Sequence, residues 1–380
     1  MDLSDIRREI DTIDAELIQL ICRRMDCAQS VAEYKAANNM AVLNQKREEE
    51  IIERVKRSCD DYRDGYGNAA AIIFASMMDA SRALQHQVLA AGAELRNSID
   101  QAKRRLIPSD RVRIACQGIP GAYSDEAANK IFPGTRPRFY ETFEDVFSAV
   151  RDEQADYGIL PVENSSAGSV NEVYDLVMKY RFTIAAAVEL PINHCLLGLP
   201  GTDLQNLKAV YSHPQGLAQC GDFIARHHLE PRPFINTAAA ARMVAESGDA
   251  SISAIASSAA AGIYGLQIIE ENIQSIDNNN TRFIVISRDL VISDDANKIS
   301  LIFALPHVTG SLYRILSRFA MAGLNLTKLE SRPQRSGGFE YLFYIDFEGN
   351  FGNPATIDLL CALSEELPSF SFIGNYKEMD

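Results

Sequence analysis

Apolar side chains recur every three or four positions over the first hundred residues, which is the period of an amphipathic helix. In the first of these segments the repeat begins at Ile6 and continues to Val31. We predict a helix with Ser4 as its N-cap that ends near Asn38, about 50 Å long at 1.5 Å per residue. Two further helices are predicted over residues 44–58 and 68–104. Because so small a domain cannot bury the apolar side of such a long helix, we expect a partner subunit to cover it.

The pattern of polar and apolar positions changes after residue 105, where Pro108 and its polar neighbours interrupt the helical period. Short β-rich runs then alternate with helical ones up to about residue 290, which is typical of an α/β domain with a mainly parallel sheet. A second polar linker follows at residues 294–297.

The last segment shows the order β-α-β-β-α-β, which is that of the ferredoxin-like fold. Its predicted strands cover residues 300–305, 326–331, 341–347 and 370–376, and its predicted helices cover residues 311–322 and 354–366. We therefore expect a multidomain chain. It is divided into an all-α domain at 1–105, an α/β domain at 111–290 and an α+β domain at 298–380.

Composition and charge narrow the classes of function. The 380 residues carry a formal net charge of −14, which argues against a nucleic-acid partner. No run approaches the roughly 20 apolar residues that a membrane span needs, and the acidic N-terminus does not resemble a signal peptide. The seven cysteines are scattered without a Cys-x-x-Cys pair, which favours reduced thiols in a cytoplasmic protein. Because the histidines lack the company of other metal ligands, we expect neither a metal nor a cofactor.

Cations on the predicted N-terminal helices are candidates for anion binding. Arg24 and Lys35 are 11 positions apart, about 20° around a helix, and so share a face. Arg7 lies about 100° away from Arg24, so it is better placed to serve a neighbouring subunit's pocket. Ser81 and Gln85 stand at i and i+4 and face the same way. Taken alone, these residues could equally be solvated groups on helix surfaces.

From Leu3 to about Gln87 the chain resembles the all-helical chorismate mutases, which are dimers of three-helix protomers. Seven residues fall on that family's functional positions: Arg7, Arg24, Lys35, Arg47, Glu48, Ser81 and Gln85. One position departs from the best-known relative, since Asn44 stands in place of an Asp. The resemblance implies that chorismate, a dicarboxylate, rearranges to prephenate without a nucleophile, an acid or a metal.

That reaction requires a catalyst that holds the folded substrate and stabilises charge on its ether oxygen. The resemblance assigns the carboxylates to Arg7, Arg24 and Arg47, with Arg7 crossing into the partner's site. It assigns the ether oxygen to Lys35 and Gln85, and the ring hydroxyl to Glu48.

In the α/β segment, candidate motifs lie just beyond or beside predicted strands. They are Gly118–Ser124, Pro161–Ser169, Ser212–Gln215 and Asn280–Phe283. Turn chemistry and helix capping could explain each loop by itself. Together they are more specific, because ligands of open α/β sheets bind beyond the carboxyl ends of the strands.

This segment resembles prephenate dehydratase over nearly its whole length, including Thr281-Arg282-Phe283. The resemblance implies two lobes with a cleft, as in type II periplasmic binding proteins, and the loss of carbon dioxide and a ring hydroxyl from prephenate. We assign Thr281 to the leaving hydroxyl and Arg282 to a carboxylate, with substrate-binding roles for Asn164, Ser165, Ser212 and His213. A threonine hydroxyl is a weak acid, so Glu163 and His213 stay open as alternative proton donors.

The C-terminal segment resembles the ACT domain of phenylalanine-regulated dehydratases. The resemblance lies in Gly310-Ser311-Leu312, in Asn325-Leu326 and in Glu330-Ser331-Arg332-Pro333, with Ser311 in place of the family's Ala. It implies that these elements bind L-phenylalanine between paired domains. We number Gly310, Leu312, Asn325, Leu326, Glu330, Ser331, Arg332 and Pro333 among the allosteric residues.

The sequence therefore predicts a bifunctional chorismate mutase–prephenate dehydratase of L-phenylalanine biosynthesis. We expect it to convert chorismate through prephenate to phenylpyruvate, under feedback inhibition by phenylalanine. We also expect a cytoplasmic homo-oligomer, at least a dimer through the N-terminal helices and the ACT domains, with no nucleic-acid or membrane partner. The alternatives are a cytoplasmic amino-acid sensor without catalysis, which would need none of Lys35, Gln85 and Thr281, and an enzyme with one decayed site.

Overall fold

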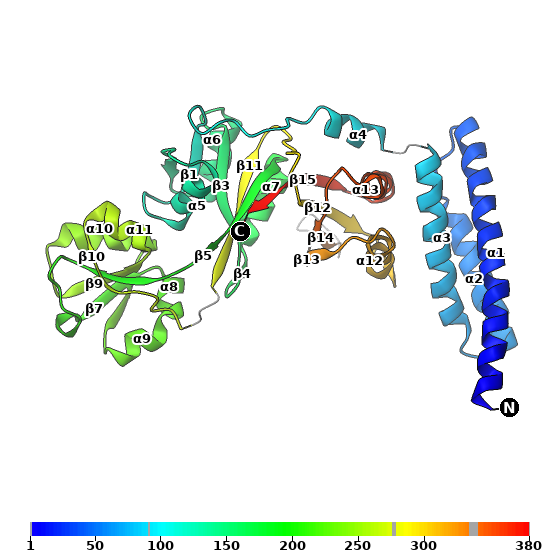
Figure 1. Ribbon diagram of the computed structural model, residues 1–380, viewed down its shortest axis with the longest axis horizontal. Helices are drawn as coiled ribbons and strands as arrows, with labels where there is room; N and C mark the ends of the chain where they lie inside the picture. The colour runs from blue at the N-terminus through cyan, green and yellow to red at the C-terminus, as the bar shows by residue number, and fades with distance from the viewer. Residues whose placement is uncertain (1, 90–91, 276–278, 334–340, 380) are drawn as a thin grey trace. The chain divides into compact units, whose positions relative to one another are not determined.

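The computed structural model describes residues 2–89, 92–275, 279–333 and 341–379. Its contacts divide the chain into two compact units (Figure 1). Unit 1 comprises Met1–Gln101 and Lys298–Phe372, and unit 2 comprises Ala102–Asn297 and Ile373–Asp380. The N-terminal helices and most of the C-terminal segment therefore belong to one unit, although the whole α/β segment separates them in the sequence.

Three long helices open unit 1: α1 (Leu3–Ala37), α2 (Gln45–Tyr62) and α3 (Gly67–Leu89). The N-cap of α1 is Asp2 rather than the expected Ser4, because the Asp2 carboxylate accepts hydrogen bonds from the backbone N–H groups of Ser4 and Asp5. Asn44 caps α2 by accepting from the Arg47 N–H. The predicted single helix over 68–104 is wrong at its end. A separate helix, α4 (Ala93–Asp100), begins after Gly92, whose φ of 76° is left-handed and interrupts a helix.

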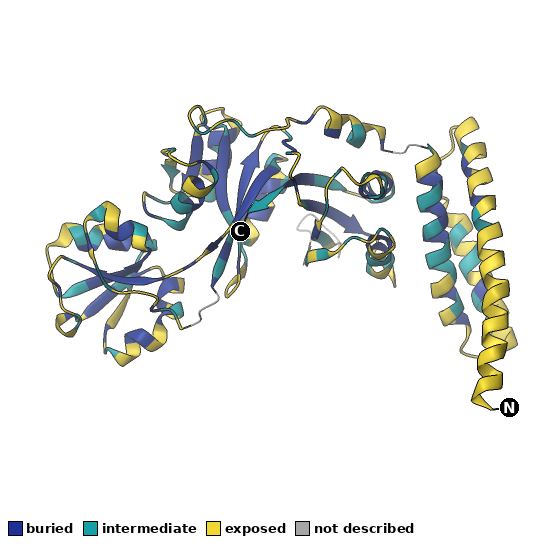
Figure 2. Cartoon of the chain, in the orientation of Figure 1, coloured by how far each residue is buried: buried dark blue, intermediate teal, exposed yellow. Residues whose placement is uncertain are grey.

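Helix α1 is mostly exposed, and only Ala28 and Ala32 on it are buried (Figure 2). Its exposed large apolar side chains follow the helical repeat that the sequence showed: Leu3, Ile6, Ile10, Ile13, Leu17, Ile18, Leu20, Ile21 and Val31. A stripe of this length is costly to leave in water. The partner subunit expected from the sequence stays a prediction, and this stripe is the surface it would cover.

The C-terminal part of unit 1, here called the C-terminal module (Lys298–Phe372), follows the predicted β-α-β-β-α-β order. Its elements are β12 (Lys298–Leu305), α12 (Ser311–Met321), β13 (Leu326–Pro333), β14 (Tyr341–Glu348), α13 (Pro354–Glu366) and the start of β15 (Ser371–Met379). The strand order is β13-β14-β12-β15, with β14 antiparallel to both β12 and β13. Apolar side chains of β12 and β14 and both helices form its core, and α12 and α13 also pack against α3.

Unit 2 has two lobes, whose strands belong to two different sheets (Figure 1). The strands of the first lobe are β1 (Ile114–Gln117), β2 (Arg138–Tyr140), β3 (Tyr157–Asn164), β4 (Gly168–Ser169), β5 (Thr183–Pro191) and β11 (Asn280–Ser287), and its helices are α5 (Tyr123–Ile131), α6 (Phe143–Arg151) and α7 (Asn171–Tyr180). The strands of the second lobe are β6 (Cys195–Gly198), β7 (Ala209–Ser212), β8 (Glu230–Pro233), β9 (Ile252–Ala256) and β10 (Gln267–Glu270), and its helices are α8 (Pro214–Gln219), α9 (Gly221–Arg226), α10 (Thr237–Ser247) and α11 (Ser258–Tyr264).

The sheets of unit 2 are mixed rather than mainly parallel, which corrects the expectation from the sequence. Strand β11 is antiparallel to its two neighbours, β3 and β5, and β6 is antiparallel to β9 and β10. The reason is topological. The chain leaves the first lobe after β5, builds the second lobe, and returns as β11 in the opposite direction between two existing strands. This return places the start of β11 beside the end of β3.

The cysteines form no disulfide and divide between core and surface. Cys116, Cys195, Cys220 and Cys361 are buried, whereas Cys22 and Cys27 are exposed on α1. Within the described residues, no helix is long and apolar enough to cross a membrane. A search of the same residues finds no group of three His, Cys, Asp or Glu side chains that could hold a metal ion.

Candidate active sites

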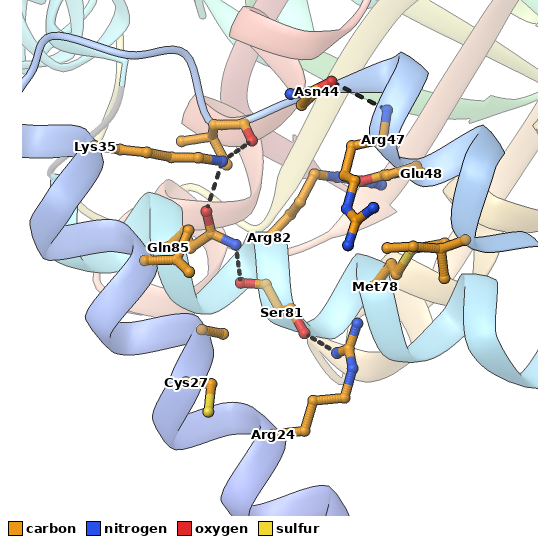
Figure 3. A pocket seen from close by; sticks show the side chains of 14 residues that line it. Arg24, Cys27, Lys35, Asn44, Arg47, Glu48, Met78, Ser81, Arg82 and Gln85 are labelled. Carbon is orange, nitrogen blue, oxygen red and sulfur yellow. Dashed lines mark hydrogen bonds and ion pairs between the residues drawn. The ribbon is translucent and has the colours of Figure 1, made fainter.

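The first candidate site is a cavity of about 290 Å³ among α1, α2 and α3 (Figure 3). The structure gathers six of the seven predicted mutase residues on its wall: Arg24, Lys35, Arg47, Glu48, Ser81 and Gln85. Asn44 also lines the cavity, at the start of α2. Three helices that meet only in the folded protein thus supply four cations (Arg24, Lys35, Arg47 and Arg82), one carboxylate and several neutral donors to one space.

Hydrogen bonds hold the donors of this pocket in place. The Lys35 ammonium donates to Gln85 Oε1 at 3.0 Å and to the Val42 carbonyl at 2.5 Å. Arg24 Nη1 donates to Ser81 Oγ at 2.5 Å (Figure 3). Lys35 and Gln85, which were assigned to one oxygen of the substrate, are therefore direct neighbours, as that shared task requires.

The surroundings of Lys35 in the pocket change its pKa. Burial lowers the pKa of Lys35, and the nearby Arg82 guanidinium lowers it further, while the Glu48 carboxylate opposes both. Lys35 consequently loses its proton more readily than an exposed lysine does. A protonated lysine can donate a hydrogen bond to an oxygen that gains negative charge.

Arg82 is a wall residue that the sequence analysis did not identify. Its side chain is 5% exposed, and it forms ion pairs with Glu48 and with Asp79. Burial opposes its charge, but Glu366, Glu48 and Asp79 outweigh burial and raise the pKa of Arg82. In the sequence, Asp79 and Arg82 look like an ordinary i, i+3 surface pair, so no local signal marks Arg82 as part of the site.

Arg7 does not join the cavity within this chain. It lies in the exposed first turns of α1, whereas Arg24 and Lys35 reach the pocket from the second half of that helix. The predicted role of Arg7 in the site of a partner subunit stays a prediction.

The second candidate site lies in unit 2, where β3 and β11 pair side by side. Thr281 and Asn164 are cross-strand partners and so share one face of the sheet. Asn164 Nδ2 donates to Thr281 Oγ1 at 2.9 Å, and both residues are largely buried, with exposures of 7% and 8% for Asn164 and Thr281. Since the Thr281 oxygen accepts this bond, its own O–H is available to donate to a ligand.

The Asn164 amide is fixed on both sides. Its oxygen accepts from the backbone N–H groups of Ser166 and Ala167 at 3.2 and 2.9 Å, and from the Ser166 hydroxyl at 2.7 Å. Backbone N–H groups can only donate, so these bonds require the amide NH₂ to point towards Thr281 and Asn279. The turn after β3 therefore orients the donor that holds the Thr281 hydroxyl.

A chain of hydrogen bonds extends from this point into the second lobe. Gln219 Nε2, on α8, donates to Ser166 Oγ at 2.7 Å, and Gln219 Oε1 lies 2.9 Å from His194 Nε2. Burial lowers the pKa of His194, so it is neutral near pH 7 and donates through Nε2 to the Gln219 oxygen. Each donor in the series His194, Gln219, Ser166 and Asn164 thus points in the direction of Thr281.

A cavity of about 250 Å³ opens beside this series, between the two lobes of unit 2. The described residues that line it are all uncharged: Ser166, Ala167, Gln215, Ala218, Gln219, Gln274, Ser275 and Asn279. The sequence analysis missed most of these, because glutamine and serine in loops carry no distinctive spacing. The position of Gln215 and Gln219 on the helix that follows β7 is the one signal that could have pointed to them.

Arg282 lies away from Thr281, contrary to the sequence-based assignment of a shared ligand. Consecutive residues of a strand face opposite sides of the sheet, and Arg282 pairs across the strands with Glu163. Its guanidinium contacts the Glu378 carboxylate at 2.5 Å and donates to the Tyr376 hydroxyl at 2.6 Å. Arg282 and Glu163 therefore sit on the face turned away from the Asn164–Thr281 pair, where Arg282 ties β15 to the sheet.

The remaining predicted dehydratase residues have local structural contacts. Ser212 is fully buried, and its hydroxyl donates to the Ile255 carbonyl. His213 caps α8, since its Nδ1 accepts from the Gln215 N–H. The Ser165 hydroxyl accepts from the Asn280 N–H at 2.9 Å, which fastens the turn after β3 to the start of β11. Of these three residues, the structure brings only Ser165 next to the Asn164–Thr281 pair.

The predicted allosteric residues lie at two opposite ends of the strands of the C-terminal module. Leu305 at the end of β12 and Pro333 at the end of β13 both pair with Tyr341 at the start of β14, so they lie at the same end of the sheet. The loop after β12 leads to Gly310, the N-cap of α12 with a φ of 85°. The residues near this end are Gly310, Leu312, Ser331, Arg332 and Pro333, with Glu330 just before them, whereas Leu326 begins β13 at the opposite end and Asn325 precedes it.

Comparison with known proteins identifies the two halves of this arrangement. The family model of prephenate dehydratase matches residues 114–290, and that of chorismate mutase type II matches residues 6–86. Among curated proteins, arogenate dehydratase/prephenate dehydratase 1 of Arabidopsis thaliana is 42% identical over 282 residues, which cover 70% of this chain and 72% of the relative. Arogenate dehydratase 1 of Petunia hybrida is 39% identical over a match that covers 70% of this chain and 66% of the relative.

Two solved structures are similar to most of the chain. A prephenate dehydratase from Arthrobacter aurescens in complex with L-Phe is 28% identical, with a TM-score of 0.65, and the match covers 70% of this chain and 90% of that chain. GqqA, described as a novel type of quorum quenching acylase, is 34% identical with a TM-score of 0.64, over 69% of this chain and 97% of its own. The chain therefore belongs to the prephenate dehydratase family and carries a chorismate mutase type II domain ahead of its two-lobed dehydratase domain.

Proposed function

We propose that this protein converts chorismate to prephenate in the α1–α3 pocket and prephenate to phenylpyruvate in unit 2. The observation that carries the proposal is the pocket of Figure 3, where six side chains selected from sequence alone converge on one cavity. The product of that reaction is the substrate of the second family to which the chain is similar. Two successive steps of phenylalanine biosynthesis would then be joined in one polypeptide.

The mutase step needs only shape and charge. Arg24 and Arg47 would bind the two carboxylates of chorismate in its folded conformer, helped by Arg7 from a second copy of the chain. Lys35 and Gln85 would turn from each other towards the ether oxygen as the carbon–oxygen bond breaks, and Glu48 would accept a hydrogen bond from the ring hydroxyl. No proton is exchanged, and the atoms of chorismate are only rearranged.

The dehydratase step consumes one proton and releases carbon dioxide and water. Thr281 would donate its O–H to the leaving ring hydroxyl while Asn164 holds its oxygen. The electrons of the breaking carbon–carboxylate bond enter the ring and expel the hydroxyl group, which takes a proton and leaves as water. The described residues of the neighbouring cavity wall are uncharged, which supports this step, because a carboxylate that is weakly solvated loses carbon dioxide more easily.

Regulation by L-phenylalanine is the third part of the proposal. It is supported by the β-α-β-β-α-β order of the C-terminal module and by the position of Gly310, Leu312 and Ser331–Pro333 near one end of its strands. Asn325 and Leu326 lie at the opposite end of β13, so one copy of the module does not assemble all eight residues. Two copies would be needed, which agrees with an oligomer held also through the apolar stripe of α1. A cytoplasmic location also stays a prediction.

The deciding experiment supplies the purified chain with chorismate and follows phenylpyruvate, with and without L-phenylalanine. We expect phenylpyruvate to form and to decrease when phenylalanine is added. The variant Thr281→Ala should accumulate prephenate, because it keeps the first site and loses the second. Arogenate should be offered as a second substrate, since several relatives are named arogenate dehydratases. No consumption of any substrate would overturn the proposal in favour of a sensor without catalysis.

A further inference from the structure

A cluster of ion pairs joins the mutase pocket to the C-terminal module within unit 1. On the pocket side, Glu48 forms one ion pair with Arg82 of α3 and another with Arg314 of α12, where Arg314 Nη2 lies 3.2 Å from Glu48 Oε2. Asp79 of α3, whose side chain is 1% exposed, also pairs with both arginines, at 3.0 Å from Arg314 Nη2. Arg314 thus reaches from a domain far along the sequence to a carboxylate on the wall of the pocket.

The other side of the cluster is centred on Glu366, the last residue of α13. Its carboxylate lies 3.3 Å from Arg82 Nε and 2.8 Å from Arg318 Nη1, and His86 Nε2 approaches it at 2.6 Å. Burial opposes ionisation of Glu366, but His86, Arg318 and Arg82 outweigh it and lower its pKa to about 2. Three carboxylates, Glu48, Asp79 and Glu366, therefore face three arginines, Arg82, Arg314 and Arg318.

We propose that Arg314 is a positioning residue of the mutase site, which holds the Glu48 carboxylate in place from the C-terminal module. Arg314 touches no substrate in this assignment and acts only through Glu48. The inference rests on the proposed mutase activity, and it adds that α12 is a working part of that site. The same helix carries Leu312, a predicted allosteric residue, two positions before Arg314. The proposed phenylalanine site and the Arg314–Glu48 ion pair therefore share the short helix α12.

Three carboxylates share the Arg82 side chain. Its guanidinium contacts Glu48, Asp79 and Glu366, but its single positive charge cannot neutralise three carboxylates. With Arg314 present, Asp79 and Glu48 each have a second cation, and Arg82 can hold Glu48 in the pocket. Without Arg314, the more deeply buried Asp79 and Glu366 compete for Arg82, since buried carboxylates lose more free energy when unpaired.

Arg314→Ala in the full-length protein is the direct test, with the mutase reaction measured as chorismate consumption and the dehydratase reaction measured from prephenate. We expect kcat/KM for chorismate to fall about 3- to 10-fold. A loss of this size is larger than that for an exposed ion pair and smaller than that for a buried one, because the Arg314 side chain is 38% exposed. The loss should lie mainly in KM, since Glu48 would bind the ring hydroxyl before and during the reaction. The rate from prephenate should not change.

Three further variants separate positioning from simple packing. Arg314→Lys keeps the charge and should recover part of the loss. Asp79→Asn combined with Arg314→Ala should be more active than Arg314→Ala alone, because Arg82 then has one competitor fewer for Glu48. Arg57→Ala is the matched control, since it removes an exposed arginine from the same helix as Glu48. It should leave the mutase rate unchanged.

The outcomes are distinct. An inactive wild-type mutase would refute the proposed function itself. An active wild type with an unaffected Arg314→Ala variant would refute the positioning role of Arg314 alone. A variant that loses activity without recovery by lysine or by Asp79→Asn would show a packing role instead, and that also overturns the inference.

Discussion

Asn164→Asp is the most informative substitution in the dehydratase domain, because it changes the hydrogen-bonding character of one group without changing its shape. The Asn164 oxygen and its bonds to the turn after β3 would be retained. The NH₂ group, which now lies 2.9 Å from Thr281 Oγ1, 2.8 Å from Asn279 Oδ1 and 3.2 Å from the Asn280 carbonyl, would become an acceptor oxygen. The Thr281 hydroxyl would then donate to the new carboxylate and no longer to the substrate.

The size of the effect follows from these contacts. Capture of the Thr281 proton removes the donor that we propose for the leaving group, so we expect kcat/KM for prephenate to fall about 10²- to 10³-fold, as when an oxyanion donor is removed. Stability should change less. Asn279 can reverse its amide, whose nitrogen has no hydrogen-bond partner in the described structure, and only the Asn280 carbonyl is left facing an oxygen. A loss of about 1–3 kcal/mol in unfolding free energy is therefore expected.

The assay compares phenylpyruvate formation by wild type and variant from about pH 8 to about pH 5, over which a buried carboxylate can take up a proton. Protonation of the new carboxyl group restores a donor to the Thr281 oxygen, so the ratio of variant to wild-type activity should rise as the pH falls. The control is Asn236→Asp, which exchanges one good N-cap of α10 for another. Mutase activity is the internal reference. Wild-type dehydratase activity in Asn164→Asp at pH 8 would refute the reasoning.

Two further predictions concern pH. Burial lowers the pKa of Lys35 below its ordinary value, so mutase activity should decline at a lower pH than the pH at which an exposed lysine loses its proton. Chorismate consumption measured over an alkaline pH series tests this. A decline only at the ordinary lysine pKa would contradict the prediction. The pKa of Glu366 is lowered from 4.5 to about 2, so its ion pairs stabilise the fold above pH 4.5 and lose that contribution as the pH falls towards 2. The loss amounts to about 3 kcal/mol of unfolding free energy. Urea unfolding at several pH values should show this loss in wild type but not in Glu366→Gln. Equal pH dependence of the unfolding free energy in both proteins would refute the prediction.

Much of this protein follows from its sequence because the relevant signals are local. The helical repeat predicts α1 and α2, and the alternation of strands and helices predicts every element of the C-terminal module. A helix fixes which positions share a face, so the spacing of Arg24 and Lys35 is enough to place them on the same side of α1. The helical repeat runs on through Gly92, so it does not show that α3 and α4 are separate helices.

Only the tertiary structure shows which face of each strand or helix is turned towards a candidate site. Thr281 and Arg282 are neighbours in sequence, yet strand geometry sends them to opposite faces, and only the pairing of β11 with β3 shows that Thr281 meets Asn164. Ser212 follows a strand as a ligand-binding residue would, but its hydroxyl is used inside the sheet. The Arg314–Asp79 pair joins residues 235 positions apart, a contact that no local pattern reveals. Local periodicity determines the elements, whereas long-range packing determines which of their polar groups are left for chemistry.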